Sequence, residues 1–298
     1  MNTPDKIIFV HKGAMGDFLQ TWPCIAHIRT TLPHTQMFWA GRSDWEFWLH
    51  ALGIEPLPPA LLKSVNSLYA AETLPNTLRD FRIIWFGLRT NPLSVRDPDL
   101  WFLQGIVENS FTRPKQLYLK ALREKMALTG PEPDWRAVFP PLRNRGEEIL
   151  IFPGSGHPMK CWPLERFKFL ASRLRESGAP VRFILGPAEM DHFRIDEFPV
   201  VVSHTVEHLH GLVQRAGMVI GNDTGPMHLS SCNGIPGVSL FGPSSARQWA
   251  PPGMRVIRGK APCRPCTQDG RISCQENACI KSIGIDEVWQ AVRSLQSR

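Results

Sequence analysis

No stretch of this 298-residue sequence is apolar for long enough to cross a membrane. The early apolar run at residues 7–10 is too short for the core of a signal peptide, and nothing approaches the roughly 20 apolar residues of a membrane helix. We therefore expect a cytoplasmic protein. Cysteine is too sparse for a disulfide framework, because seven thiols in so long a chain are more typical of reduced side chains or metal ligands.

Two common phosphate-binding motifs are also missing. The glycine-containing loops at residues 11–17 and 153–157 lack the G-x-G-x-x-G spacing of dinucleotide-dependent dehydrogenases, and Met159 stands where the last glycine is needed. The G-x-x-x-x-G-K-[ST] sequence of P-loop ATPases and kinases is absent. These absences argue against both enzyme classes.

The residues that are present are typical of a globular protein, with 43% hydrophobic and 20% charged side chains. The length suits two hydrophobic cores better than one. A net charge of +7 favours anionic partners, although composition alone leaves nucleic acid, anionic lipid and phosphorylated glycan open.

Strand and helix patterns alternate along the chain, which predicts an α/β protein with parallel sheets. Buried strands are expected at residues 7–10, 37–40, 82–86, 149–152, 181–185, 218–220 and 237–241, whereas residues 54–80 are ambiguous. A helix is expected from about Phe18, with Thr21 as its cap and Pro23 in its first turn or at a kink. The proline-rich residues 130–147 predict a linker between two Rossmann-like domains that face each other across a cleft.

Three glycine-containing loops follow predicted strands, at residues 11–17, 153–157 and 221–225. Such loops line the ligand crevice of open α/β sheets, and their N–H groups and the next helix start can bind an anion. Lys160 would add a full positive charge. Any one loop is explained equally well as a simple chain turn with Lys160 in solvent, but three together predict a site.

Three segments form a recognisable set, namely residues 15–23, residues 153–156 with 160–163, and residues 222–229 followed by 240–244, of which the last is the most specific. Together they resemble glycosyltransferase family 9, the ADP-heptose:lipopolysaccharide heptosyltransferases. The resemblance implies the GT-B fold, with an acceptor-side domain at residues 1–140, a nucleotide-sugar domain at 148–284 and a final helix at 285–298 that packs back toward the first domain. It also implies inverting transfer of heptose from ADP-heptose to the inner core of lipopolysaccharide, with no metal cofactor needed for catalysis. The expected acceptor is an anionic glycolipid met at the inner face of the cytoplasmic membrane, and no nucleic acid partner is expected.

The resemblance also assigns roles to single residues. Asp17 is the expected general base and Glu189 the ribose ligand, while Asp223 is expected to bind sugar hydroxyls. The residues expected around the donor diphosphate are Ser155, Gly156, Lys160, Thr224, Gly225 and His228. Two alternatives stay open, namely that Asp17 only caps a helix and that His228 is an interior histidine.

The first loop departs from the family pattern. Many members carry a basic residue six positions before the aspartate and a serine between them, where this chain has His11, Gly13 and Ala14, with Lys12 displaced by one. We expect His11, Lys12 and Gly16 to lie on the acceptor side. The departure leaves open a different acceptor, a nucleotide-sugar-binding protein without turnover, or a GT-B-like epimerase or hydrolase.

Two further clusters carry hypotheses. Cys263, Cys266, Cys274 and Cys279 have a spacing that fits a structural zinc or iron site, and reduced thiols without a ligand are the alternative. The basic residues of a predicted helix at 114–128 would attract anionic lipid, unless they form an ordinary solvated face.

Overall fold

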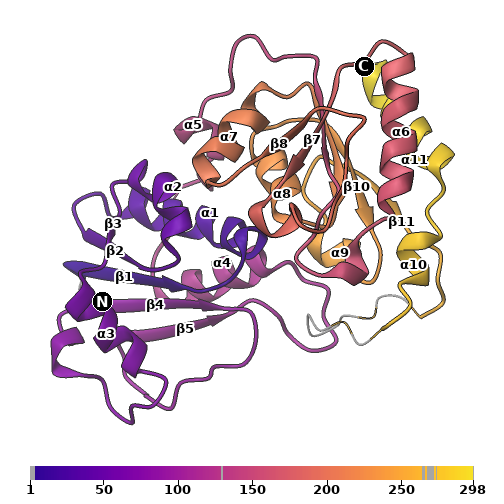
Figure 1. The fold of residues 1–298 in the computed structure, drawn as a ribbon. Helices are drawn as coiled ribbons and strands as arrows, with labels where there is room; N and C mark the ends of the chain where they lie inside the picture. The colour runs from indigo at the N-terminus through magenta and orange to yellow at the C-terminus, as the bar shows by residue number, and fades with distance from the viewer. Residues whose placement is uncertain (1–3, 129, 264–265, 267–271, 273, 298) are drawn as a thin grey trace. The chain divides into compact units, whose positions relative to one another are not determined.

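The computed structural model describes residues 4–128, 130–263, 266, 272 and 274–297. The chain divides into two compact units, unit 1 (Met1–Val138) and unit 2 (Phe139–Arg298) (Figure 1). Each unit contains one parallel sheet with helices in the connections, so the predicted α/β class with two Rossmann-like domains is confirmed.

Unit 1 is built on a five-stranded sheet with the order β3-β2-β1-β4-β5. Its strands are β1 (Lys6–His11), β2 (Gln36–Gly41), β3 (Glu55–Pro56), β4 (Arg82–Gly87) and β5 (Leu100–Gln104). Its helices are α1 (Met15–Thr31), α2 (Glu46–His50), α3 (Pro59–Ser67), α4 (Pro114–Lys125) and α5 (Trp135–Val138), with short 3₁₀ turns η1 (Ser43–Trp45) and η2 (Asn76–Leu78).

Unit 2 is built on a six-stranded sheet with the order β11-β10-β9-β6-β7-β8. Its strands are β6 (Ile149–Phe152), β7 (Val181–Leu185), β8 (Val200–Val202), β9 (Met218–Asn222), β10 (Gly237–Phe241) and β11 (Arg255–Arg258). Its helices are α6 (Leu164–Glu176), α7 (Val206–Arg215), α8 (Gly225–Cys232), α9 (Ala246–Trp249), α10 (Ala278–Lys281) and α11 (Ile285–Gln296), with 3₁₀ turns η3 (Pro158–Lys160) and η4 (Pro187–Glu189).

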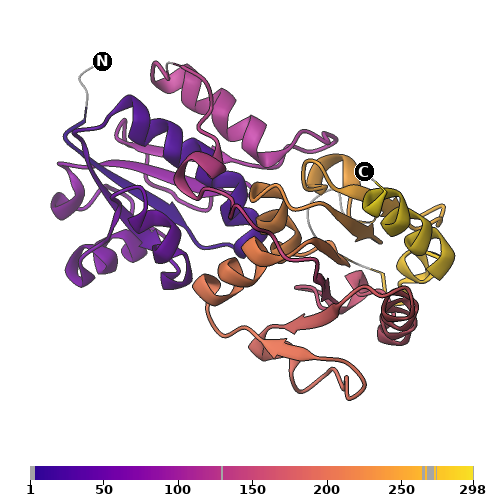
Figure 2. The same ribbon diagram turned by 90° about the horizontal axis from the view of Figure 1, so that it is seen from above.

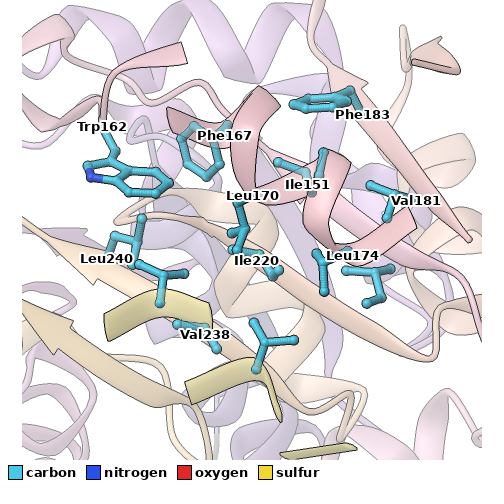
Figure 3. Packing of buried hydrophobic residues seen from close by; sticks show 14 of the residues in the cluster. Ile151, Trp162, Phe167, Leu170, Leu174, Val181, Phe183, Ile220, Val238 and Leu240 are labelled. Carbon is cyan, nitrogen blue, oxygen red and sulfur yellow. The ribbon is translucent and has the colours of Figure 1, made fainter. Parts of the chain in front are cut away.

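The core of unit 2 explains why its apolar strands and amphipathic helices fold together. Phe167, Leu170 and Leu174 recur on one face of α6 and pack on Ile151 of β6 and Phe183 of β7 (Figure 3). Helix α11 lies beside α6 (Figures 1 and 2), and its apolar residues complete this same core. The apolar face of α11 is thus taken up within unit 2. The predicted packing of this helix toward the N-terminal domain stays a prediction.

Helix α1 begins earlier than its sequence pattern predicts. It starts at Met15 after Ala14, and Pro23 lies inside it rather than in its first turn. Thr21 is an interior residue whose hydroxyl donates to the carbonyl of Phe18 at 2.8 Å, so its predicted role as the cap was wrong. The early start places Asp17 within the first turn of α1.

The strand order fixes where each sheet offers a ligand crevice. In both sheets the first strand lies between its successor and the fourth strand, so the chain turns to opposite sides at β1/β4 and at β6/β9. Ligands of open parallel sheets bind beyond the carboxyl ends of the two strands at such a switch point. The loops after β1, β6 and β9 all begin at these places.

Candidate functional site

In unit 2, Asn222 connects the two loops that flank the switch point. This last residue of β9 is fully buried, and its amide nitrogen donates to the carbonyl of Pro153 at 2.7 Å. Its amide oxygen accepts from the backbone N–H of Trp162 at 2.9 Å. Asn222 therefore holds the glycine loop after β6 against the end of β9, a positioning role that the sequence analysis did not assign.

Asp223 is the centre of a polar cluster at this switch point. Its side chain is 7% exposed, and the Nζ atom of Lys160 lies 2.8 Å from its Oδ2 atom. The hydroxyl of Ser244 donates to the same carboxylate oxygen at 2.6 Å, and the hydroxyl of Ser155 donates to the backbone carbonyl of Asp223 at 2.9 Å. Three residues predicted from two separate segments therefore meet, together with Ser244, which had no assigned role.

Glu189 lies directly against the glycine loop of this cluster. A Cβ atom at Gly154 would fall 1.5 Å from its Oε1 atom, so a larger residue there would force this carboxylate to move. Glu189 accepts from the backbone N–H of Gly186 at 2.8 Å, while burial raises its pKa. Burial and then the Glu189 carboxylate raise the pKa of the neighbouring Cys161 thiol to about 11.

The remaining predicted donor residues surround the start of α8. Thr224 is its N-cap in an extended conformation without a side-chain capping bond, and Gly225 is the first helical residue. His228 is buried, with 5% of its surface exposed. Gly156 borders open space, since a Cβ atom built there meets nothing within 4 Å. N–H groups that lack a partner within the helix can hold an anion at such a helix start.

In unit 1, Asp17 lies in the first turn of α1, beyond the switch point at β1/β4. The helix is capped at Ala14, so the alternative that Asp17 is the N-cap is wrong. Gly16 precedes Asp17 in the same turn. A Cβ atom at Gly13 would lie 2.8 Å from Nε2 of His11 and 3.1 Å from Cβ of Asp17. Gly13 thus fits between these two side chains, where the bulkier serine of the family would crowd the His11 ring.

His11 is buried rather than presented to solvent. It is 2% exposed, and its ring lies near those of Phe18 and Trp39 at centroid distances of 6.3 and 6.4 Å. Burial lowers its pKa to about 4, so the imidazole is neutral at pH 7. Its Nδ1 atom has no hydrogen-bond partner in the described part of the chain. The place of His11 on the acceptor side stays a prediction, and its neighbour Lys12 is exposed.

The other three C-terminal cysteines influence the thiol of Cys266. Burial raises the pKa of the Cys266 thiol, and Cys263, Cys279 and Cys274 raise it further. Among the residues that the structure describes, no group of three or more Cys, His, Asp and Glu side chains is arranged to hold a metal ion. A structural zinc or iron at these cysteines stays a prediction.

The basic helix α4 is partly neutralised. Lys115 pairs with Glu132 at 2.7 Å, and the Nζ atom of Lys125 lies 5.4 Å from the centre of the Trp101 ring. Lys120 and Arg123 are exposed. Within the described ranges, no helix combines the length and apolar character needed to cross a membrane.

Two Rossmann-like units, each with a glycine loop at its switch point, define an α/β protein of the GT-B class. A sequence model described as glycosyltransferase family 9 (heptosyltransferase) matches residues 132–279. The chain belongs to glycosyltransferase family 9.

Curated relatives agree with this assignment, and solved structures share the fold. Lipopolysaccharide heptosyltransferase 3 of Escherichia coli is 26% identical over 50% of this chain, which spans only 48% of that relative's length. Lipopolysaccharide core heptosyltransferase OpsX of Haemophilus influenzae is 20% identical over 83% of this chain and 82% of its own. E. coli heptosyltransferase WaaC, solved with ADP, has a TM-score of 0.67 at 15% identity, covering 97% of this chain and 99% of its own. The family 9 glycosyltransferase of Veillonella parvula has a TM-score of 0.70 at 17% identity, covering 99% and 98%.

Proposed function

We propose that this protein transfers heptose from ADP-heptose to the inner core of lipopolysaccharide. The observation that carries the proposal is the meeting of Ser155, Lys160, Asp223 and Glu189 at the β6/β9 switch point. Curated relatives are named as lipopolysaccharide heptosyltransferases, and WaaC, which shares the fold, was solved with ADP and with ADP-2-deoxy-2-fluoro heptose.

The donor diphosphate would bind the N–H groups of the glycine loop and of the start of α8, beside His228. Lys160 then faces two anions, because it already pairs with Asp223. In the proposal the diphosphate attracts the Lys160 ammonium, and the freed Asp223 oxygens accept from sugar hydroxyls. Glu189 accepts from both vicinal hydroxyls of the ribose.

The transfer forms a bond between an acceptor oxygen and the anomeric carbon and breaks the bond from that carbon to the diphosphate. Asp17 takes the proton of the attacking hydroxyl, and the electron pair of the broken bond leaves with ADP. Lys160 and the backbone N–H groups stabilise the charge that develops on the leaving group. Attack opposite the leaving group inverts the anomeric configuration.

The test is a transfer assay with the purified full chain, ADP-heptose and Kdo-lipid A, followed by ADP release and product mass. We expect ADP release only when both substrates are present, and UDP-sugars should not replace the donor. Donor breakdown without acceptor would instead favour the hydrolase or epimerase alternative. ADP binding without turnover on any core acceptor would favour a binding protein. The cytoplasmic location and the contact with the inner membrane stay predictions.

A further inference from the structure

Lys12 is held in an unusual position just beyond the carboxyl end of β1. Its Nζ atom donates to Oδ1 of Asn66 in α3 at 2.5 Å. The same ammonium lies 5.2 Å from the centre of the Tyr69 ring and 5.8 Å from that of Trp85 in β4. Three separate parts of unit 1 therefore converge on one exposed cation.

The described residues supply no negative charge to balance this cation. In the part of the chain that the structure describes, Lys12 forms no ion pair, and only one of its three donors is used by Asn66. Partial burial against the two rings lowers its pKa, because these surroundings disfavour the charged form. An anion bound here would compensate for the favourable interactions with water that the ammonium has lost through partial burial.

Tyr69 supplies an accessible aromatic surface beside this cation. Its side chain is 46% exposed, although the other tyrosine of the chain, Tyr118, is fully buried. The buried Trp85 meets the Tyr69 ring edge-on at 5.3 Å and 89°, which fixes its orientation. An exposed ring held in this way can pack against the apolar face of a sugar.

The location also points to a ligand. Trp85 pairs in register with Val10 of β1, so the cluster lies across the β1/β4 switch point of unit 1. The loop that carries Lys12 continues into the first turn of α1, where Asp17 lies. A group bound at the cluster would thus contact Lys12, a residue that is close in sequence to the proposed base, Asp17.

We propose that Lys12, Asn66 and Tyr69 form an acceptor subsite for an acidic sugar, with the sugar ring against Tyr69 and its carboxylate or phosphate on Lys12. The subsite rests on the proposed function, because it names the acceptor chemistry of that reaction. It also gives the displaced lysine of the first loop a role that the family pattern does not supply.

Binding of small probes to the intact chain tests the subsite without turnover. One arm uses the methyl glycoside of Kdo, which carries a carboxylate, and the other uses glucosamine 1-phosphate. We expect one of them to bind with a dissociation constant that rises roughly tenfold or more in Lys12→Met, because a charge-assisted contact is lost. Tyr69→Leu should weaken the same probe, whereas Tyr69→Phe should retain its binding.

Lys6→Met is the matched control, since Lys6 also lies over an aromatic ring, 5.5 Å from the centre of Phe81, but at the amino end of β1. It should bind both probes as the wild type does, and ADP affinity should be unchanged in every variant. The subsite is refuted if neither probe binds the wild type, or if Lys12→Met and Lys6→Met bind alike. The proposed function fails by a different result, namely absence of transfer to any core acceptor although the probes bind.

Discussion

Lys160 is the residue whose contacts make the sharpest prediction about the donor. It neutralises Asp223 at 2.8 Å, and the proposal asks it to bind diphosphate as well. We expect Lys160→Ala to weaken ADP binding roughly tenfold to hundredfold, the effect of losing a hydrogen bond to a charged group. Calorimetry measures this change. Lys168→Ala is the control, since Lys168 pairs with Glu165 and Glu197 instead. Equal ADP affinity in both variants would remove Lys160 from the donor site.

Asp17 is expected to affect the chemical step and not donor binding. Asp17→Asn keeps the size of the side chain but removes the proton acceptor, so we expect kcat to fall by roughly 10²–10⁴ with unchanged ADP affinity. Asp286→Asn is a matched control, because Asp286 also lies in the first turn of a helix. Transfer by Asp17→Asn at the wild-type rate would exclude the role as base.

The buried His11 makes stability depend on pH. The folded protein keeps its imidazole neutral down to its pKa of about 4, whereas the unfolded chain takes up a proton near pH 6.5. The neutral imidazole therefore makes its full contribution to the free energy of unfolding above about pH 6.5. This contribution declines as the pH falls toward 4, and about 2 kcal/mol of it is lost at pH 5.

Urea unfolding at pH 7.5 and pH 5 measures this effect. We expect His11→Leu to lose less stability between the two pH values than the wild type does. His210, whose pKa is also lowered by burial, is retained in both proteins and cancels in the comparison. The exposed His34→Leu should keep the wild-type difference. Equal pH dependence in the wild type and His11→Leu would show that His11 does not titrate in this way.

At the scale of elements, the loop after β6 makes a prediction from two neighbouring glycines. Gly154→Ala would place a methyl group 1.5 Å from the Glu189 carboxylate, whereas Gly156→Ala meets nothing within 4 Å. We expect Gly154→Ala to destabilise the protein by roughly 1–3 kcal/mol and to weaken ADP binding, while Gly156→Ala keeps wild-type stability. Adding Glu189→Ala to Gly154→Ala should restore stability but not ADP affinity. Thermal unfolding and calorimetry report the two effects separately.

The regular elements were largely predictable, and the exceptions have physical causes. The apolar runs of β1, β6, β9 and β10 predict buried parallel strands because both faces of each strand are covered. The start of α1 was missed because Pro23 disfavours a helix locally, yet Phe18, Trp22 and Ile25 are buried on this helix. Tertiary packing here outweighs the local preference of proline.

The candidate site was predictable where a motif follows a strand and not elsewhere. Ser155, Lys160 and Asp223 lie in such loops, and the fold brings them together. Asn66 and Tyr69 have no local signal, since one lies in α3 and the other shortly after it, and only the sheet topology brings them to Lys12. The roles of the site residues stay predictions until the variants are measured.

At the scale of the whole molecule, the net charge of +7 bears on the predicted membrane contact. An anionic bilayer attracts nearby Lys and Arg side chains with about 1 kcal/mol each, and salt screens this attraction beyond roughly 8 Å at physiological ionic strength. Lys120 and Arg123 are the exposed basic residues of α4, because Lys115 already pairs with Glu132 and Lys125 lies against Trp101. They are therefore the residues of this helix best able to approach a lipid surface.

We expect the full chain to sediment with vesicles that contain anionic phospholipid and to be released several-fold when salt rises from 0.1 to about 0.5 M. Reversal of both charges, Lys120→Glu with Arg123→Glu, should reduce vesicle binding at low salt. The reduction should exceed that caused by two charge reversals in unit 2, which change the net charge by the same amount. Arg194→Glu with Arg255→Glu provides that control, because both arginines are exposed. Equal loss in the two double variants would show that net charge alone drives binding and that α4 is an ordinary solvated face. Vesicles without anionic lipid should bind none of the proteins, since the predicted contact is electrostatic.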